Sequence, residues 1–342
     1  MKISWESPSN IALIKYWGKK DIQLPSNPSI SFTLSECKTT TEVHFSKGSG
    51  VNITLDGLDK PEFIPKIESY LERIIHRHPW LSSYNLQIKT SNSFPHSSGI
   101  ASSASGMSAL SLCIVDFAQK LNFKFDALNF YQEASILSRL GSGSASRSIY
   151  GGIAVWGNSP SLKGSNDEYA IKYPGLINPI FEDYHDVVLL VEVGEKSVTS
   201  TIGHALMNNH PFGKQRFSQA HKHLNEIQEI LKTGDIENFI RLTELEALTL
   251  HGLMMSSSPN YILMKPNTLK IIEEIREFRS ESELPLSFTL DAGANVHVLF
   301  PGSAKKKAME FINSNLIQYC KENRFILDQV GSGPKRLTNF VK

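Results

Sequence analysis

Short apolar runs alternate with polar segments over the first hundred residues. Residues 28–34 and 38–46 are rich in β-branched and aromatic side chains, and residues 51–55 and 85–90 repeat the pattern. Runs of this kind predict β-strands. Residues 65–76 lie between two of these runs and predict a helix. The N-terminal part of the chain is therefore expected to combine strands with helices.

Two helices, each with one apolar stripe, are predicted between residues 103 and 141. The stripe of the first recurs every three or four positions, at Met107, Leu110, Ile114, Phe117 and Leu121. The stripe of the second comprises Leu128, Tyr131, Ala134 and Leu137, and Gly141 is typical of a helix end. Strands are predicted at residues 151–157 and 187–193, and the second is apolar enough for a buried strand.

Longer helices follow from about residue 195. They are predicted over residues 203–233, 235–255, 267–280 and 304–316, with breaks at Pro259 and Pro266. Strands are predicted at residues 286–290 and near the C-terminus, and residues 296–300 predict either a strand or a helix. The pattern indicates an α+β protein, and a length of 342 residues favours two domains. We expect residues 1–192 to form the first domain and residues 193–342 the second.

Composition narrows the class of protein. Lys and Arg number 35 and Asp and Glu number 34, so the basic excess of a nucleic-acid-binding protein is missing. The three cysteines are far apart in the sequence, which argues against a disulfide framework or a zinc site. No apolar run approaches the roughly 20 residues of a membrane helix, and the first ten residues show no signal-peptide pattern. We expect a cytoplasmic protein without nucleic-acid or membrane partners.

The first candidate site is a segment of small residues from Pro95 to Ala104 that leads into the helix predicted near Ser103. Small residues let a ligand approach the backbone, and a helix N-terminus suits phosphate because its N–H groups are unpaired. Ser102 and Ser103 could add hydroxyl groups to phosphate or Mg²⁺. The same serines could also form an ordinary helix cap. The chain contains no Walker A loop and no GxGxxG after a strand.

Three further segments carry polar groups suited to catalysis. Arg147 ends a Gly/Ser run and could clamp a carboxylate or phosphate, or lie in a solvated turn. Asp291 follows a predicted strand and could be a general base or a turn residue. In residues 10–20, lysines beside Tyr16 and Trp17 could reach a polyphosphate, or extend along a strand end.

The eleven histidines give no convincing metal-binding pattern. HExxH does not occur in the sequence. His76 and His78, and likewise His221 and His223, are expected on helix surfaces rather than at a metal ion.

Four segments, taken in order, resemble the diphosphomevalonate decarboxylase family of the GHMP kinase superfamily. Residues 10–21 match its NIAxIKYWGKxD motif, and residues 94–106 match FPxxxGLASSAxG with Ile100 in place of Leu. Residues 141–152 match GSGSACRSxYGG with Ser146 in place of Cys, and residues 290–295 match FDAGPN with Ala294 in place of Pro. The matches extend over essentially the whole chain, and four in order are far more specific than one.

The resemblance implies a fold and a reaction. The fold is that of a two-domain GHMP kinase, with an N-terminal domain like ribosomal protein S5 and a C-terminal ferredoxin-like domain, assembled as a homodimer. The reaction uses ATP and Mg²⁺ to phosphorylate the 3-hydroxyl of mevalonate 5-diphosphate. The new phosphate then leaves as the C1 carboxylate is lost as carbon dioxide, which gives isopentenyl diphosphate. Such a phosphoryl transfer depends mainly on alignment and charge neutralisation.

Matching positions imply roles for individual residues. Asp291 would orient or deprotonate the 3-hydroxyl, and Arg147 would hold the C1 carboxylate, while Asn10, also a catalytic candidate, would orient either that arginine or the carboxylate. Lys19, also a catalytic candidate, and Tyr16 would contact the 5-diphosphate, together with Ser142, Ser144 and Ser200. The loop expected around the ATP phosphates comprises Pro95, Ser98, Gly99, Ile100, Ala101, Ser102 and Ser103, with Ser103 nearest Mg²⁺.

Two departures from the family pattern leave alternatives open. His204 stands where Met is common, and Thr201 stands where some bacterial members carry Arg, which leaves fewer cations for a diphosphate. One alternative is therefore a decarboxylase of the 5-monophosphate, and another is a mevalonate 3-kinase that releases no carbon dioxide. A non-catalytic ligand-binding protein on the same fold would be expected to lack Asp291, Arg147 or the phosphate loop, and all three are present.

Overall fold

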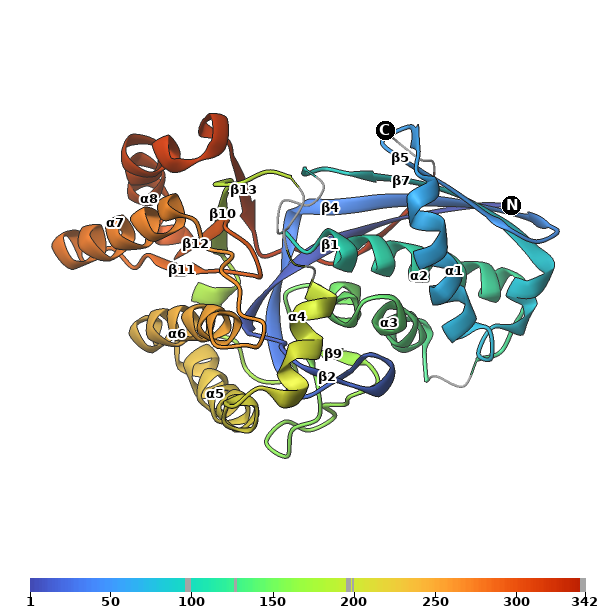
Figure 1. Ribbon diagram of the computed structural model, residues 1–342, viewed down its shortest axis with the longest axis horizontal. Coiled ribbons are helices and arrows are strands. Elements are labelled where there is room, and N and C mark those ends of the chain that lie inside the picture. The colour runs from blue at the N-terminus through green and yellow to red at the C-terminus, as the bar shows by residue number, and fades with distance from the viewer. Residues whose placement is uncertain (96–99, 126–127, 195–197, 199, 339–342) are drawn as a thin grey trace.

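Two β-sheets lie beside each other, and helices pack against both (Figure 1). The computed structural model describes residues 1–95, 100–125, 128–194, 198 and 200–338. Within them, the larger sheet has eight strands in the order β14-β1-β4-β7-β5-β6, with β8 paired to β4 and β9 to β8. The smaller sheet has four strands in the order β11-β12-β10-β13. The predicted α+β class with two units is confirmed.

Most of the larger sheet comes from the first half of the chain. Its strands are β1 (Lys2–Ile14), β4 (Ser29–Lys47), β5 (Val51–Leu55), β6 (Leu58–Asp59), β7 (Tyr84–Asn92), β8 (Ile153–Trp156), β9 (Ala170–Lys172) and β14 (Lys335–Leu337). Strand β4 unites two separately predicted strands, because the residues between them form a bulge in the pairing with β1 and do not end the strand. A small hairpin, β2 (Lys19–Lys20) and β3 (Leu24–Pro25), follows β1.

Three helices pack against the larger sheet: α1 (Ile64–Ile74), α2 (Ser102–Lys120) and α3 (Phe130–Gly141). A helix was predicted in each of these three regions, and this is confirmed. Some of the apolar positions predicted to be buried in α2 and α3 are wrong. Leu121 lies just beyond α2 and is exposed, and Leu128 precedes α3 and is 88% exposed. Tyr131 is also exposed, because the buried side of α3 is formed by residues from Glu133 to Leu140.

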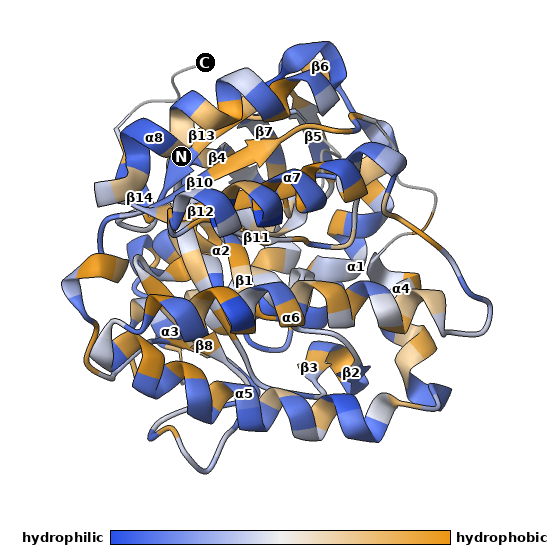
Figure 2. Cartoon of the chain, turned by 90° about the vertical axis from the view of Figure 1, so that its left-hand side faces the viewer, coloured by the Kyte–Doolittle hydropathy of each residue, from blue (hydrophilic) through white to orange (hydrophobic). Residues whose placement is uncertain are grey.

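The smaller sheet is sandwiched between helices. Its strands are β10 (Tyr184–Leu189), β11 (Ser287–Thr289), β12 (Val296–Pro301) and β13 (Phe325–Gln329), and its helices are α4 (Ser200–Leu206), α5 (Gly213–Thr233), α6 (Ile236–Met255), α7 (Pro266–Ser282) and α8 (Lys305–Phe311). Helices α7 and α8 share one apolar cluster with the sheet, and α5 and α6 share another. Figure 2 shows these helices with mixed hydrophobic and hydrophilic surfaces, as expected for elements that cover a sheet.

Two predicted elements have different limits in the structure. The helix predicted over 203–233 is divided into α4 and α5 by a turn that contains Pro211, a residue without a backbone N–H. Strand β10 begins three residues before the predicted strand at 187–193 and ends at Leu189. The short helical segments are η1 (Asp21–Gln23), η2 (Pro61–Phe63), η3 (Pro79–Ser83), η4 (Gly143–Ile149), η5 (Pro179–Phe181), η6 (Met207–Asn209), η7 (Gly302–Ala304), η8 (Ile312–Leu316), η9 (Ile317–Tyr319) and η10 (Lys321–Asn323).

Each sheet contains a strand that lies on the other side of the predicted boundary in the sequence. Strand β10, which precedes residue 193, pairs with β12 and β13 of the smaller sheet. Strand β14, near the C-terminus, pairs with β1 of the larger sheet. The division between residues 192 and 193 therefore stays a prediction. Among the described residues, no helix has the length and apolar character required to span a membrane.

A carboxylate from the smaller sheet stabilises an irregular part of β4. Between the pairs Pro8–Lys38 and Asn10–Thr33, the register of β1 and β4 shifts, so the backbone around residues 34–37 bulges. The side chain of Asp328 accepts hydrogen bonds from the backbone N–H groups of Ser35, Glu36 and Cys37 at 2.7–2.8 Å. These bonds replace those that the bulge removes from the ladder. Asn10 lies directly beside this irregularity and lines a cavity of the protein.

Candidate active site

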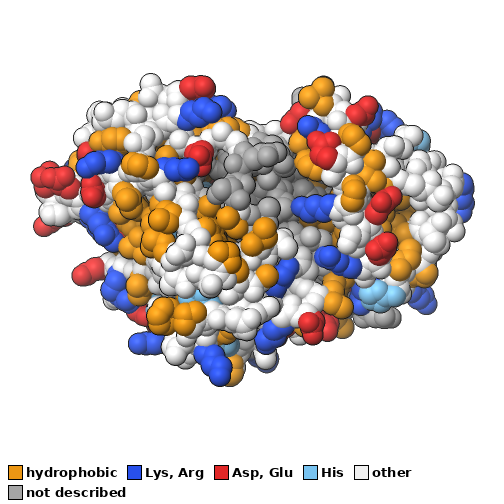
Figure 3. Space-filling model, in the orientation of Figure 1, with side chains coloured by type: hydrophobic (Ala, Val, Ile, Leu, Met, Phe, Trp, Pro, Cys, Tyr) orange, Lys and Arg blue, Asp and Glu red, His pale blue; other side chains and the backbone are white. Residues whose placement is uncertain are grey.

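A cavity of about 630 Å³ is lined by residues of both units. Its walls come from the end of β1, the start of α2, the segment that contains η4, helix α4 and the turn after β11. Figure 3 shows the molecule hollowed between two lobes, with basic side chains along one edge of the hollow. A cavity of this size is typical of sites that enclose small molecules. Its two ends differ in chemistry, since one is polar and the other apolar.

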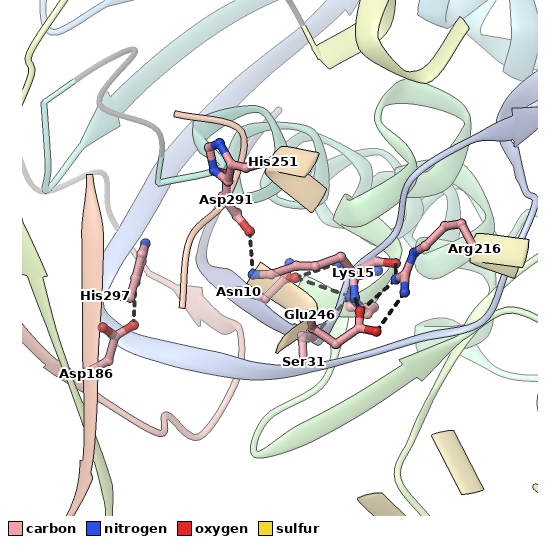
Figure 4. A network of polar contacts seen from close by, with 10 residues as sticks. Asn10, Lys15, Ser31, Asp186, Arg216, Glu246, His251, Asp291 and His297 are labelled. Carbon is pink, nitrogen blue, oxygen red and sulfur yellow. Dashed lines mark hydrogen bonds and ion pairs between the residues drawn. The ribbon is translucent and has the colours of Figure 1, made fainter. Parts of the chain in front are cut away.

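Lys15 and Asp291 form the centre of the polar end (Figure 4). Lys15 follows β1, Asp291 follows β11, and the Nζ of Lys15 lies 3.1 Å from Oδ1 of Asp291. The Lys15 side chain is 2% exposed and that of Asp291 is 24% exposed. Burial lowers the pKa of Lys15, while the adjacent carboxylate opposes this shift. The pair thus fixes a carboxylate that still faces the cavity.

A second buried ion pair holds the backbone of Lys15. Glu246 on α6 accepts a hydrogen bond from the Lys15 N–H at 2.8 Å, and Arg216 on α5 donates one to the Lys15 carbonyl at 3.0 Å. Arg216 and Glu246 are joined by two bonds of 2.7 and 2.6 Å, and His223 contacts the same carboxylate at 2.5 Å. Burial alone would raise the pKa of Glu246, but the Arg216 charge and these hydrogen bonds lower it to about 2. The Lys15 backbone is therefore held at both its donor and its acceptor.

Arg147 lies in η4, beside the Lys15–Asp291 pair. Its Nε and Nη2 donate to Oδ1 of Asn10 at 3.2 and 3.1 Å, and Nε and Nη1 donate to the hydroxyls of Ser31 and Ser29 at 3.0 and 2.6 Å. Burial lowers its pKa to about 10, so the guanidinium keeps its charge at neutral pH. Of its five N–H groups, one on each terminal nitrogen finds no acceptor among the described residues. Arg147 lines the cavity, and two unused N–H groups of a guanidinium can bind both oxygens of a planar anion.

Asn10 is a positioning residue for Arg147. Its Nδ2 donates to the Ser144 carbonyl at 3.1 Å and to the Ser148 hydroxyl at 2.8 Å, while its Oδ1 accepts from Arg147. Since these contacts use both functions of the amide, Asn10 orients the arginine rather than a ligand. The sequence left both roles open.

The 5-diphosphate candidates lie along one wall of the cavity. Tyr16, Lys19, Ser142, Ser144 and Ser200 all line it, as do Thr201 and His204. Tyr16 packs edge-on against Trp156 at 4.7 Å between ring centroids. A Cβ on Gly143 would lie 2.7 Å from Trp156 and 2.9 Å from the Tyr16 hydroxyl, so only glycine leaves space for this arrangement. Burial and the nearby Arg73 charge lower the pKa of Lys19.

The start of α2 forms the adjoining wall. Ala101, Ser102 and Ser103 line the cavity, and the Ser103 hydroxyl lies 3.3 Å from that of Ser142. Ala101 has a φ of 45°, a left-handed conformation that is uncommon for a residue with a side chain. Pro95 and Ile100 are not among the described residues that line the cavity, and Ile100 is instead buried with its carbonyl bonded to Ser9. Ser98 and Gly99 lie outside the described residues.

The other end of the cavity is an apolar arm. Side chains from β5, η2, α1, β7 and α2 line it, namely Ile53, Leu55, Phe63, Ile67, Ile88, Met107 and Leu110. Thr39, Thr41, Thr90 and Asn92 add a polar edge, where Thr39 is bonded to Asn92 at 2.7 Å. The sequence did not predict this arm, because its side chains come from five separate elements.

Sequence reasoning also missed polar residues. Lys15 belongs to a recognised segment but was not singled out, although its place at the end of a buried strand was a usable signal. The expectation of surface positions is wrong for His78 and His223: both are buried, bonded to Glu133 at 2.9 Å and to Glu246 at 2.5 Å. Among the described residues, no three or more His, Cys, Asp or Glu side chains form a group that could hold a metal ion.

Comparisons with known proteins match both parts of the chain to models of one family. Residues 7–170 match the family described as diphosphomevalonate decarboxylase-like N-terminal domain, and residues 186–337 match the mevalonate 5-diphosphate decarboxylase C-terminal domain. The diphosphomevalonate decarboxylase of Candida albicans is 27% identical, with 98% of each chain covered.

Solved structures are similar over the whole length. A complex of MDDEF with MVAPP, AMPPCP and magnesium superposes with a TM-score of 0.84 at 29% identity, covering 98% of this chain and 99% of that one. The mevalonate diphosphate decarboxylase of Staphylococcus aureus gives a TM-score of 0.84 at 28% identity, with 98% of each chain covered. The two family matches together span nearly the entire sequence, and the fold and the four motifs agree with them. The chain belongs to the diphosphomevalonate decarboxylase family.

Proposed function

We propose that this protein catalyses the ATP-dependent decarboxylation of mevalonate 5-diphosphate to isopentenyl diphosphate, with release of ADP, phosphate and carbon dioxide. The observation that carries the proposal is the placement of Lys15, Asp291 and Arg147 around one end of a single cavity. This end offers a carboxylate to a hydroxyl group and a guanidinium fork to a carboxylate. Relatives named as decarboxylases of this substrate support the assignment.

Arg147 and Asp291 align the substrate between them. The two remaining N–H groups of Arg147 hold the C1 carboxylate, and Asp291 accepts a hydrogen bond from the 3-hydroxyl. Lys15 keeps the Asp291 carboxylate in place and adds positive charge where the phosphoryl group arrives. Tyr16, Lys19, Ser142, Ser144 and Ser200 take the 5-diphosphate, which anchors the substrate far from the reacting carbon.

ATP extends from the apolar arm to the start of α2. The adenine ring lies among the apolar side chains of the arm, because a flat aromatic base is stabilised by such contacts. The triphosphate lies along residues 101–103, where the N-terminus of α2 favours negative charge. The solved relative in complex with AMPPCP and magnesium supports the binding of a nucleotide by this protein.

The residues at the start of α2 fit a magnesium ion that is held mainly by phosphate oxygens. Ser103 offers a hydroxyl in the cavity next to Ser142, and the described residues provide no carboxylate cluster for a fully protein-bound ion. When bound, Mg²⁺ neutralises charge on the ATP phosphates. Ser103 would hold it together with those phosphates.

The reaction transfers the γ-phosphoryl group to the 3-hydroxyl oxygen, and Asp291 receives the hydroxyl proton. The C3–O bond then breaks and phosphate leaves with its electron pair. The C1–C2 bond breaks to release carbon dioxide, and its electrons form the C2–C3 double bond. Arg147 holds the carboxylate in position for this step.

We also propose that the protein is located in the cytoplasm and forms a homodimer. The three cysteines, Cys37, Cys113 and Cys320, are all free and buried, which suits the reducing conditions of the cytoplasm. The family resemblance favours a homodimer. Size-exclusion chromatography with light scattering would return twice the chain mass of 38.2 kDa if this is correct.

The function is tested by incubation with ATP, Mg²⁺ and, separately, mevalonate, its 5-phosphate or its 5-diphosphate. ADP and carbon dioxide are measured together. We expect equal amounts of both with the 5-diphosphate alone. Equal release of ADP and carbon dioxide with the 5-phosphate would instead identify a decarboxylase of the 5-monophosphate. ADP without carbon dioxide would indicate a 3-kinase.

A further inference from the structure

His204 lines the cavity at the diphosphate wall and is held there by two aromatic rings. It lies on α4, its ring centroid is 4.2 Å from that of Tyr16 and 4.7 Å from that of Trp17, and the residue is 8% exposed. Because the ring is packed on these sides, its orientation in the cavity is fixed. Which of its two nitrogens carries a proton therefore decides which hydrogen bond the ring can offer to a ligand.

A backbone hydrogen bond defines the tautomer of His204. The N–H of Gly18 donates to Nδ1 of His204 at 3.0 Å. A nitrogen that accepts a hydrogen bond carries no proton, so a neutral ring must carry its proton on Nε2. Gly18 has a φ of 99°, and a Cβ there would lie 2.9 Å from Phe217, so this turn requires glycine.

The surroundings of His204 keep the ring neutral. Burial lowers its pKa to about 3, and the nearby charges of Lys19 and Arg147 act in the same direction. Tyr16, the titratable group that packs on the ring, is itself held neutral, because burial raises its pKa far above the ordinary value. At neutral pH the ring therefore offers a donor without carrying a charge.

We propose that the Nε2–H group of His204 donates a hydrogen bond to a phosphoryl oxygen of the substrate's 5-diphosphate, which makes His204 a substrate-binding residue. This inference rests on the proposed function. The described residues offer no acceptor to Nε2, and Lys19, Ser200 and Thr201 line the same wall. The donor would add a neutral hydrogen bond to the charge that Lys19 brings to the same wall.

The test compares two substitutions that separate donation from packing. His204→Met fills similar space without a donor, whereas His204→Gln can accept from Gly18 and still donate toward the cavity. Affinity for mevalonate 5-diphosphate is measured by calorimetry without ATP, so that no turnover occurs. We expect roughly 10- to 100-fold weaker binding for the Met variant, the range for loss of a hydrogen bond to a charged group, and a smaller loss for Gln.

A role in packing alone would reverse this order, because Met replaces the apolar contacts with Tyr16 and Trp17 better than Gln does. Equal affinity of the Met variant and the unsubstituted protein, or weaker binding by Gln than by Met, would overturn the inference. Failure of the unsubstituted protein to bind the diphosphate would instead count against the proposed function itself.

The tautomer can be measured without any ligand. Two-bond ¹H–¹⁵N correlation spectra of histidine-labelled protein at pH 7 should show His204 neutral and protonated on Nε2, with assignment by the His204→Gln variant. A signal for an imidazolium, or for the tautomer protonated on Nδ1, would overturn the inference even if the protein binds and converts the substrate.

Discussion

The two ends of the cavity are built in different ways. At the polar end, Lys15, Asp291 and Arg147 are each held by hydrogen bonds to buried partners, and the backbone of Lys15 is fixed by Arg216 and Glu246. In the apolar arm, the lining apolar side chains belong to the hydrophobic core or pack against it.

This difference follows from what each end has to do. Chemistry at a single carbon requires groups placed to a fraction of an ångström, and such placement needs a rigid polar scaffold. Binding of a flat base requires area and shape, which a core surface supplies. We therefore expect substitutions at the polar end to affect rate or stability strongly, and substitutions in the arm to affect affinity modestly.

The largest effect is expected for Asp291→Asn. The amide keeps the shape of the carboxylate but cannot take the 3-hydroxyl proton, and it loses the charge that pairs with Lys15. Turnover, measured as linked ADP and carbon dioxide release, should fall by about 1,000-fold, with nucleotide binding retained. Asp183→Asn removes an exposed carboxylate outside the cavity and should leave the rate unchanged. Near-normal turnover by the Asp291 variant would remove Asp291 from the mechanism.

Glu246→Gln tests the scaffold beneath Lys15. Loss of this carboxylate leaves Arg216 buried without its counter-charge, which should lower the free energy of unfolding by about 3 kcal/mol in a urea titration. The matched control is Glu229→Gln, where the Lys232 pair is exposed on both sides and should change stability by less than about 0.5 kcal/mol. Similar effects of the two substitutions would show that the buried pair is no more important than a surface one.

The same carboxylate predicts a pH dependence. Because the folded-state pKa of Glu246 lies at about 2, below the ordinary 4.5, its charge stabilises the fold above pH 4.5. That contribution should be lost as the pH falls from 4.5 toward 2. The difference in stability between the unsubstituted protein and the Gln variant should therefore shrink over this range, and a difference that stays constant would contradict the assignment.

Arg147→Lys should lower kcat/KM by roughly 10- to 100-fold, because an ammonium group cannot replace a planar fork that bonds Asn10, Ser29 and the substrate carboxylate together. Arg241→Lys on the exposed side of α6 serves as the control. Thermal unfolding of both variants separates loss of function from loss of fold. If the Arg147 variant is folded and fully active, Arg147 has only a structural role.

The smallest effect is expected in the apolar arm. Phe63→Ala should raise the KM for ATP about fivefold, the effect of losing roughly 1 kcal/mol of apolar contact, and should leave kcat nearly unchanged. Phe212→Ala removes an exposed ring outside the cavity and should change neither constant. A large fall in kcat for the Phe63 variant would break the distinction between the two ends.

The sequence was informative about the polar end because its groups lie in contiguous motifs. Arg147, Asp291, Ser103 and Asn10 could each be singled out because they lie in short segments that match motifs of the family. The roles of Lys15 and of the Arg216–Glu246 pair depend on contacts between residues 201 or more positions apart, which no local pattern contains. The arm was missed for the same reason, since its apolar residues look like any other core residues.

Secondary structure shows the same division between local and distant information. The helix α2 was predictable from the spacing of its apolar side chains. The shift in β1 and β4 was not, because it depends on Asp328 from the smaller sheet. Likewise, His78 and His223 were expected at the surface, since the sequence does not reveal the carboxylates that accompany them in the core.

The central claim is that decarboxylation proceeds through a phosphate placed on the 3-hydroxyl oxygen at Asp291. It is tested most directly with mevalonate 5-diphosphate that carries ¹⁸O in the 3-hydroxyl, by mass spectrometry of the phosphate released during turnover with ATP and Mg²⁺. The account predicts that the released phosphate contains the ¹⁸O atom. Phosphate without the label, formed while carbon dioxide is still released, would show that the oxygen leaves by another route and would contradict the mechanism.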